Sequence, residues 1–140
     1  MAQIPFLSPT VFNFFPPGYV VPGTAMLGPE FAIMTTGTSI QRANFVNRFI
    51  FTSPAVAGGA TNSPNGTAID ITDLQALNVA DSTGNQLVDE LNRRMLHGTM
   101  SAAMKSTILT AVTAATAGDL SRVRQAVYLV ATSSQYQVQR

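Results

Sequence analysis

Apolar side chains between residues 82 and 140 recur at steps of three and four, the spacing that places them on one face of an α-helix. Ser, Thr, Asp or Gly, the residue types that begin and end helices, bound each run. We therefore expect three helices here, and short loops make consecutive helices antiparallel neighbours. The apolar stripes are Leu87, Val88, Leu91 and Met95; Met104, Ile108, Ala111, Val112 and Ala115; and Leu120, Val123, Val127, Val130 and Ala131.

The last of these helices is predicted to be the one on which the others pack. Asp119 is placed to cap its first turn, and the pattern continues to Arg140 at the chain end. Burying about five apolar side chains yields roughly 7–15 kcal/mol, whereas ordering about fifteen residues costs roughly 15–30 kcal/mol, so this helix needs partners. Leu129 falls in the polar sector of its helical wheel. It is either a tolerated surface leucine or a second contact, to another part of the chain or to a partner.

The boundaries of the other two helices follow from the same capping signals. The expected start and stop residues are, in chain order, Ser82 or Thr83, His97-Gly98, Ser101 and Gly118, the last in a left-handed conformation. The first of the two helices also has acid-before-base spacing at Asp89→Arg93 and Glu90→Arg94. Such pairs are worth a few tenths of a kcal/mol each and predict a solvent-facing ladder of charges.

Residues 1–28 are predicted to form an extended arm, because five of the eight prolines lie there and repeated prolines forbid a long helix. The arm is rich in aromatic side chains, whose large apolar area favours burial. We expect it to wrap the helical body; the alternative is that it contacts another molecule. The candidate partner-contact residues are Phe12, Phe14, Phe15 and Tyr19, together with Leu129.

The middle of the chain is predicted to contain one helix and one long loop. Pro29 and Glu30 are start signals for a helix over 29–52, and Gly37 in a threonine-rich stretch favours a kink or a break. Residues 53–81 are rich in Gly, Pro, Asn and Thr and are predicted to be a loop, in which Asp73 caps a single turn at most. A loop of this length either contacts a ligand or is a plain surface excursion.

Together these elements predict an all-α fold. It is a small helical bundle of about four helices, with an extended aromatic and proline-rich N-terminal arm and a long central loop. A length of 140 residues suits one domain. That domain would comprise the arm over 1–28, the helix over 29–52, the loop over 53–81 and a three-helix unit over 82–140.

Composition narrows the classes of partner. Charged residues make up 11% of the chain and the net charge is +1, so nucleic acid and acidic membrane surfaces have little to bind. The absence of cysteine excludes disulfides and thiol chemistry. No apolar run approaches the roughly twenty residues that span a bilayer. The N-terminus lacks the basic region of a signal peptide.

Candidate catalytic and metal-binding groups are sparse. The single histidine, His97, is expected at a helix end, which favours a capping role over that of a general base. Asp70, Asp73 and Asp81 offer oxygen ligands, but their spacing does not match a calcium-binding loop, and helix capping explains two of them. We therefore assign no catalytic, cofactor-binding or metal-binding residue from the sequence, and expect no cofactor.

Four blocks of sequence carry a family resemblance. They are SPTVFNFFPPGY at 8–19, GPEFAIM at 28–34, the small-residue helix after Ser101, and RVRQAVYLVATSSQYQVQR at 122–140. In order and spacing they resemble the C-terminal part of the bacterial family called domain of unknown function 1800. Where such proteins often carry an acidic residue before the aromatic of the last block, this chain has Gln135 before Tyr136.

The resemblance implies a particular context and no particular chemistry. Members are generally several times longer and often exported, and the family has no established activity or functional residues to transfer. It implies that the chain is the C-terminal fragment of a longer bacterial protein, exported or periplasmic. The first hypothesis is a non-enzymatic structural or protein-binding helical module, whose partner is the rest of its own longer chain or a second copy. The alternative is one lobe of an enzyme whose catalytic groups precede Met1, with the 53–81 loop and His97 lining the site.

Overall fold

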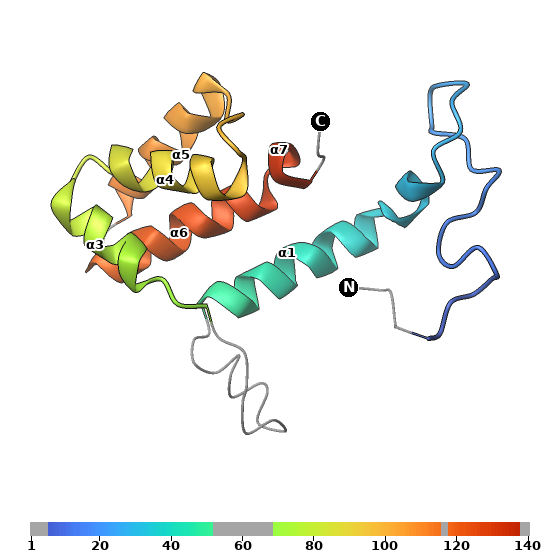
Figure 1. The fold of residues 1–140 in the computed structure, drawn as a ribbon, viewed down its shortest axis with the longest axis horizontal. Coiled ribbons are helices and arrows are strands. Elements are labelled where there is room, and N and C mark those ends of the chain that lie inside the picture. Colours follow the sequence, from blue (N-terminus) through green and yellow to red (C-terminus); the bar gives the residue numbers. More distant parts are fainter. Residues whose placement is uncertain (1–5, 52–68, 116–117, 138–140) are drawn as a thin grey trace. The chain divides into compact units, whose positions relative to one another are not determined.

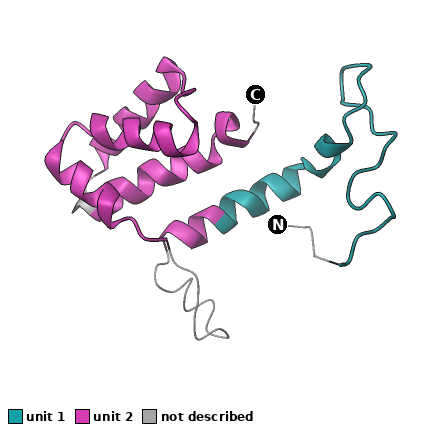
Figure 2. Ribbon diagram, viewed as in Figure 1, with its two compact units in different colours: residues 1–45 teal, residues 46–140 magenta. Residues whose placement is uncertain are grey.

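The structure is a computed structural model that describes residues 6–51, 69–115 and 118–137. It divides into two compact units, residues 1–45 and residues 46–140, and we call them the N-terminal unit and the helical unit (Figures 1 and 2). Six α-helices and one short 3-10 helix lie in the described ranges, which contain no β-strand. The all-α class predicted from the sequence is therefore confirmed. None of the helices in these ranges is long and apolar enough to cross a membrane.

The helical unit is organised around one central helix. It comprises the end of α1 (Thr36–Phe51), α3 (Thr72–Ala80), α4 (Asn85–Met95), α5 (Ala102–Ala114), α6 (Gly118–Thr132) and the single turn α7 (Ser134–Gln137) (Figure 1). Helix α6 contacts α3, α4, α5 and α7. The expectation that the last long helix is the one on which the others pack is confirmed.

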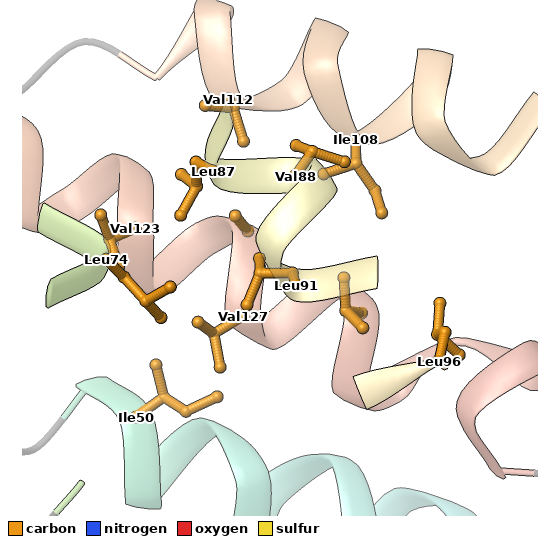
Figure 3. Packing of buried hydrophobic residues seen from close by; sticks show 12 residues of the cluster. Ile50, Leu74, Leu87, Val88, Leu91, Leu96, Ile108, Val112, Val123 and Val127 are labelled. Carbon is orange, nitrogen blue, oxygen red and sulfur yellow. The ribbon is translucent and has the colours of Figure 1, made fainter. Parts of the chain in front are cut away.

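The hydrophobic core of this unit draws side chains from five helices, which converge on one cluster in Figure 3. The expected stripes of α4 and α5 supply Leu87, Val88, Leu91, Ile108 and Val112. In α6 the stripe is shifted from the prediction, because Ala126 is fully buried while Leu120 is 39% exposed. The remaining core residues are Ile50, Leu74, Leu96, Val123, Val127 and Val130.

Helix α6 stops before the chain end, contrary to the prediction of one helix reaching Arg140. The Ser133 hydroxyl donates to the Val130 carbonyl at 2.7 Å and accepts from the Tyr136 amide at 3.2 Å. The Thr132 hydroxyl donates to the Tyr128 carbonyl at 2.7 Å. Hydroxyl groups that bond locally compete with the helix backbone, so they divide the tail into α6 and α7. Residues 138–140 lie outside the described ranges.

The start of α4 uses one of the two predicted caps, because the Thr83 hydroxyl accepts from the Asn85 amide at 3.4 Å, and it also uses Asp81 and Gly84. The residue before the helix is Gly84, in a left-handed conformation with φ of 76°. Asp81 supplies the cap from a distance, because its Oδ2 accepts a hydrogen bond from the Gln86 amide at 3.0 Å. The positive φ favours glycine at this position, and a Cβ atom on Gly84 would make a tight contact of 3.3 Å with the Val112 side chain.

The end of α4 leaves His97 outside the helix, so its expected place in the last turn is wrong. His97 lies beyond the last helical residue, Met95, with a positive φ of 52°. Asn92 organises this end instead. Its carbonyl accepts from the amides of Leu96 at 3.0 Å and Gly98 at 3.1 Å, and its side-chain Oδ1 accepts from the Met100 amide at 3.0 Å.

Helix α5 begins as expected and ends early. The Ser101 hydroxyl accepts from the Met104 amide at 3.3 Å, which confirms the predicted cap. Extended backbone at Ala115, with ψ of 120°, terminates the helix, so Gly118 is not its stop. Gly118 is already the first residue of α6, which puts Asp119 inside the first turn and not ahead of it.

Charged residues of α4 form ion pairs both within the helix and with α5, whereas the sequence predicted pairs only along α4. Glu90 pairs with Arg94 as predicted and also with Arg93, whose Nη2 lies 2.6 Å from Glu90 Oε1. Asp89 pairs with Lys105 on α5, so the predicted Asp89→Arg93 pair is wrong. The reason is that Glu90 already engages Arg93 through two hydrogen bonds.

Part of the predicted 53–81 loop is helical. Helix α3 covers Thr72–Ala80, more than the single turn allowed for at Asp73. Leu74 and Asn78 are buried on one side of it, and the polar Asn78 hides the apolar periodicity from view in the sequence. The part of the loop prediction that covers 53–68 falls outside the described residues.

The N-terminal unit contains turns, a 3-10 helix and the start of α1. Residues 6–28, expected as an extended arm, form turns closed by isolated bridges between Thr10 and Asn13 and between Val20 and Leu27. The prediction that this arm wraps the helical body stays a prediction. The helix expected over 29–52 is two helices, the 3-10 turn Pro29–Ile33 and α1.

The break lies at Met34-Thr35, two residues ahead of the Gly37 position favoured from the sequence. The Thr35 hydroxyl accepts from the Thr38 amide at 3.1 Å, and the Thr38 hydroxyl accepts from the Thr35 amide at 2.9 Å. This reciprocal arrangement satisfies two free amides at the start of α1, as a capping box does.

Candidate functional site

A pocket of about 260 Å³ lies in the helical unit, beside the first half of α6. It is enclosed by the end of α1, by residues 69–75 at the start of α3 and by α6. The loop region singled out from the sequence as a place for ligand contacts thus supplies several of its residues. The apolar wall consists of Phe49, Ile50, Ile69, Ile71 and Leu120, and the polar lining consists of Asp70, Thr72, Gln75 and Arg124.

Asp70 and Thr72 form a local turn that sets the polar edge of the pocket. Asp70 Oδ1 accepts hydrogen bonds from the Thr72 amide at 2.9 Å and from the Thr72 hydroxyl at 2.7 Å. These bonds lower the pKa of the Asp70 carboxyl below its usual value, the hydroxyl having the larger effect. Asp70 therefore carries a negative charge at neutral pH.

Arg124 brings a positive charge to the same pocket from α6. Its Nε is buried and has no hydrogen-bond acceptor in the part of the chain that the structure describes. An unpaired buried donor costs roughly 1–3 kcal/mol, and more for a charged group. Arg124 is the cationic residue among those that line the pocket, and it forms no ion pair within the described residues.

The apolar wall gives the pocket a second property. Ile50 is part of the hydrophobic core, and Ile69 and Ile71 pack against it, so this wall is anchored to the rigid part of the unit. A pocket with an apolar wall and a few polar groups has the composition of a small-molecule site, although about 260 Å³ lies just below the usual range of about 300–1,000 Å³.

The second candidate site is the apolar surface of the N-terminal unit. Among the described residues, twelve of the fifteen large apolar side chains that are exposed belong to residues 6–45. No large apolar side chain of residues 6–45 is buried, and the only buried residue there is Gly28. We call these twelve the apolar surface: Phe6, Leu7, Val11, Phe12, Phe15, Val20, Met26, Leu27, Phe31, Met34, Ile40 and Phe45.

The structure places the predicted partner-contact residues in different surroundings. Phe12 and Phe15 are exposed, at 57% and 36%, while Phe14 and Tyr19 are half-buried. Leu129 is half-buried and packs against the core of the helical unit. Two of the five therefore belong to the apolar surface.

The remaining candidate groups do not come together. His97 is exposed and is not among the residues that line the pocket. Asp73 pairs with Arg94 at 2.6 Å, and Asp81 caps α4, so each of these carboxylates has a structural partner. Within the described ranges no three His, Cys, Asp or Glu side chains are grouped so as to hold a metal ion.

Sequence reasoning missed Arg124 and Gln75. The signal that could have found Arg124 is its place one turn after Leu120, since residues four apart share a helix face. Arginines often flank the apolar stripe of a helix, because the aliphatic part of the side chain covers apolar surface. Their presence in a sequence therefore does not indicate a site. That Arg124 Nε lacks a hydrogen-bond partner within the described ranges is apparent only from the three-dimensional structure.

The chain matches no family model, no curated protein and no solved structure in the three comparisons made.

Proposed function

We propose that this chain is a non-enzymatic, protein-binding helical module, related to the C-terminal part of the bacterial family called domain of unknown function 1800. The observation that supports this is the apolar surface on residues 6–45, a unit that buries no large apolar side chain among its described residues. The family relation rests on the four sequence blocks described above. An exported or periplasmic location follows from the same resemblance.

The physical argument starts from the cost of exposed apolar area. Burial of apolar surface is worth roughly 25 cal/mol per Å², so exposed phenylalanine and leucine side chains favour any contact that removes them from water. Single exposed apolar residues are common on proteins, but a dense set along one segment marks an interaction surface. Aromatic residues and methionine are also enriched at the centres of protein–protein interfaces.

The helical unit serves as the scaffold in this proposal. Its core is formed by α3, α4, α5 and α6 with Ile50 of α1, and it contains all the large apolar side chains that are buried among the described residues. The chain as a whole then acts as a single domain, a bundle of about four helices with an aromatic arm. The partner is a polypeptide surface, either the rest of a longer chain or a second copy of this one.

The first test is self-association of the intact chain. We expect the molar mass from light scattering to rise with protein concentration, and the double substitution Phe12→Ser with Phe15→Ser to reduce that rise. Val79→Ser is the matched control, because Val79 is 67% exposed but lies on α3 in the helical unit. A monomer at every concentration that also fails to bind an apolar dye would contradict a protein-binding surface.

The alternative of an enzyme lobe is favoured by one observation, the pocket that residues 69–75 share with Arg124. His97 does not line that pocket, so it is not supported as a general base there. A loss of activity in His97→Ala without a loss of stability would restore it as a catalytic candidate.

A further inference from the structure

The pocket beside α6 combines a cation, an anion and an apolar wall in one small volume. Arg124 supplies the positive charge and Asp70 the negative one, while Phe49 and Ile71 are part of the apolar wall. We propose that this pocket binds a small monocarboxylate with a branched apolar body, the carboxylate on Arg124 and the body against the apolar wall. This site is separate from the protein-binding role proposed above and does not depend on it.

The choice of a carboxylate follows from the unpaired cation. Arg124 lines the pocket and forms no ion pair with the described residues, and a guanidinium binds carboxylates through parallel N–H donors. A bound carboxylate would neutralise the charge. A neutral ligand of the same shape would form at most a hydrogen bond.

The choice of a single negative charge follows from Asp70, a carboxylate that also lines the pocket. Asp70 is held in place by two hydrogen bonds from Thr72 and forms no ion pair among the described residues. A second anionic group on the ligand would lie in the same small pocket as this carboxylate and be repelled. Gln75 adds an amide that can donate or accept, which suits the uncharged edge of a ligand.

The size of the ligand follows from the pocket volume. A pocket of about 260 Å³ admits a molecule with few heavy atoms and excludes a long acyl chain or a nucleotide. The apolar wall is made of isoleucine, leucine and phenylalanine side chains, which match a branched aliphatic body by shape and polarity. The probe that fits these limits is 4-methylpentanoate.

The test compares 4-methylpentanoate with its neutral isostere 4-methylpentanamide, by calorimetry on the intact chain. We expect the acid to bind roughly tenfold or more tightly than the amide, because hydrogen bonds to charged groups are the stronger ones. In Arg124→Met the preference for the acid should disappear while the melting temperature stays equal to that of the wild type or rises. The rise is expected because the substitution removes an unpaired buried donor and keeps a side chain of similar length.

Arg122→Met is the matched control, since Arg122 lies on the same helix and does not line the pocket. It should leave both affinities unchanged. Should Arg124→Met fail to fold, Arg124→Gln carries the same test, and the acid-over-amide preference must again vanish. Three results would overturn the proposal: equal affinity for acid and amide, no binding of the acid at millimolar concentration, or an Arg122→Met effect as large as that of Arg124→Met.

Discussion

Gln135 and Ser101 show how one side chain can tie together parts of the chain that are distant in sequence. Gln135 Oε1 accepts from the Ser101 amide at 3.1 Å, and its Nε2 donates to the Ser101 hydroxyl at 2.7 Å. The same hydroxyl caps α5 through the Met104 amide. The amide of Gln135 thus links the start of α7 to the start of α5.

Substitution at this position tests the link. We expect Gln135→Ala to lower the free energy of unfolding by about 0.5–1.5 kcal/mol, the usual net value of one intramolecular hydrogen bond, because both partners stay solvent-accessible and recover bonds to water. Gln135→Glu should lose less, since a carboxylate accepts from both the Ser101 amide and its hydroxyl. Urea denaturation followed by circular dichroism measures both. A Gln135→Glu protein no more stable than Gln135→Ala would show that the contact is incidental.

Single capping residues were the least predictable features of the sequence. Ser101 was predicted correctly because its hydroxyl acts on the turn that immediately follows. Asp81 caps α4 from three residues before Gly84, and that geometry needs the left-handed glycine. The sequence offers Asp81, Ser82 and Thr83 as candidate caps, and the choice among them depends on backbone conformation.

Charge pairs join neighbouring helices into one unit. Arg94 contacts Glu90 on its own helix and Asp73 on α3, at 2.6 Å from Asp73 Oδ2, while Lys105 of α5 contacts Asp89 of α4. Hydrogen bonds from Arg93 and Arg94 lower the pKa of Glu90 to about 2. The ionised carboxylate is therefore favoured in the folded state.

The lowered pKa of Glu90 determines how the stability of the fold depends on pH. A carboxyl whose pKa falls on folding stabilises the fold above its unfolded pKa of about 4.5 and loses that contribution as the pH falls towards 2. We expect Glu90→Gln to melt below the wild type at pH 7, and the gap to close between pH about 4.5 and about 2. Glu30→Gln in the N-terminal unit controls for the change in net charge.

Thermal melting at fixed ionic strength across this pH range is the measurement, and added salt should also narrow the gap because exposed charges are screened. Melting curves of wild type and Glu90→Gln that stay parallel down to pH 2 would contradict the linkage.

The predictability of each helix follows from how clean its apolar stripe is. Helices α4, α5 and α6 were predicted because their buried positions are nearly all apolar. The sequence predicts a loop in place of α3 because the buried face of this helix contains Asn78 beside Leu74, and because the residues before it are rich in Gly, Pro, Asn and Thr. The pocket could be foreseen only as a region of the chain, since Arg124 and residues 69–75 are brought together by packing.

The whole molecule distributes its apolar residues unevenly. The core cluster draws on residues 50–130 of the helical unit, while most of the exposed large apolar side chains lie in residues 6–45. Composition gives the number of apolar residues in each unit but does not show which of them are buried. The sequence therefore does not reveal this difference between the two units. Among the described residues, the buried large apolar side chains lie in one unit and most of the exposed ones lie in the other.

This division predicts unequal costs for the same substitution in the two units. Leu91→Ala, at a core position that is 2% exposed, should lower the free energy of unfolding by about 2–5 kcal/mol because it removes buried area and leaves a cavity. Leu27→Ala, at a position that is 63% exposed, should change it by less than about 0.5 kcal/mol. Chemical denaturation of dilute protein measures both, at a concentration where self-association is absent.

The comparison is informative because the chemical change is identical and only the surroundings differ. If Leu27→Ala cost as much as Leu91→Ala in dilute solution, residues 6–45 would be buried within the same chain, and the arm would stabilise the fold by wrapping it. If instead Leu27→Ala destabilised the protein only at concentrations where it associates, the lost area would be that of an interface. The dependence on concentration therefore separates an arm that covers its own chain from one that covers another.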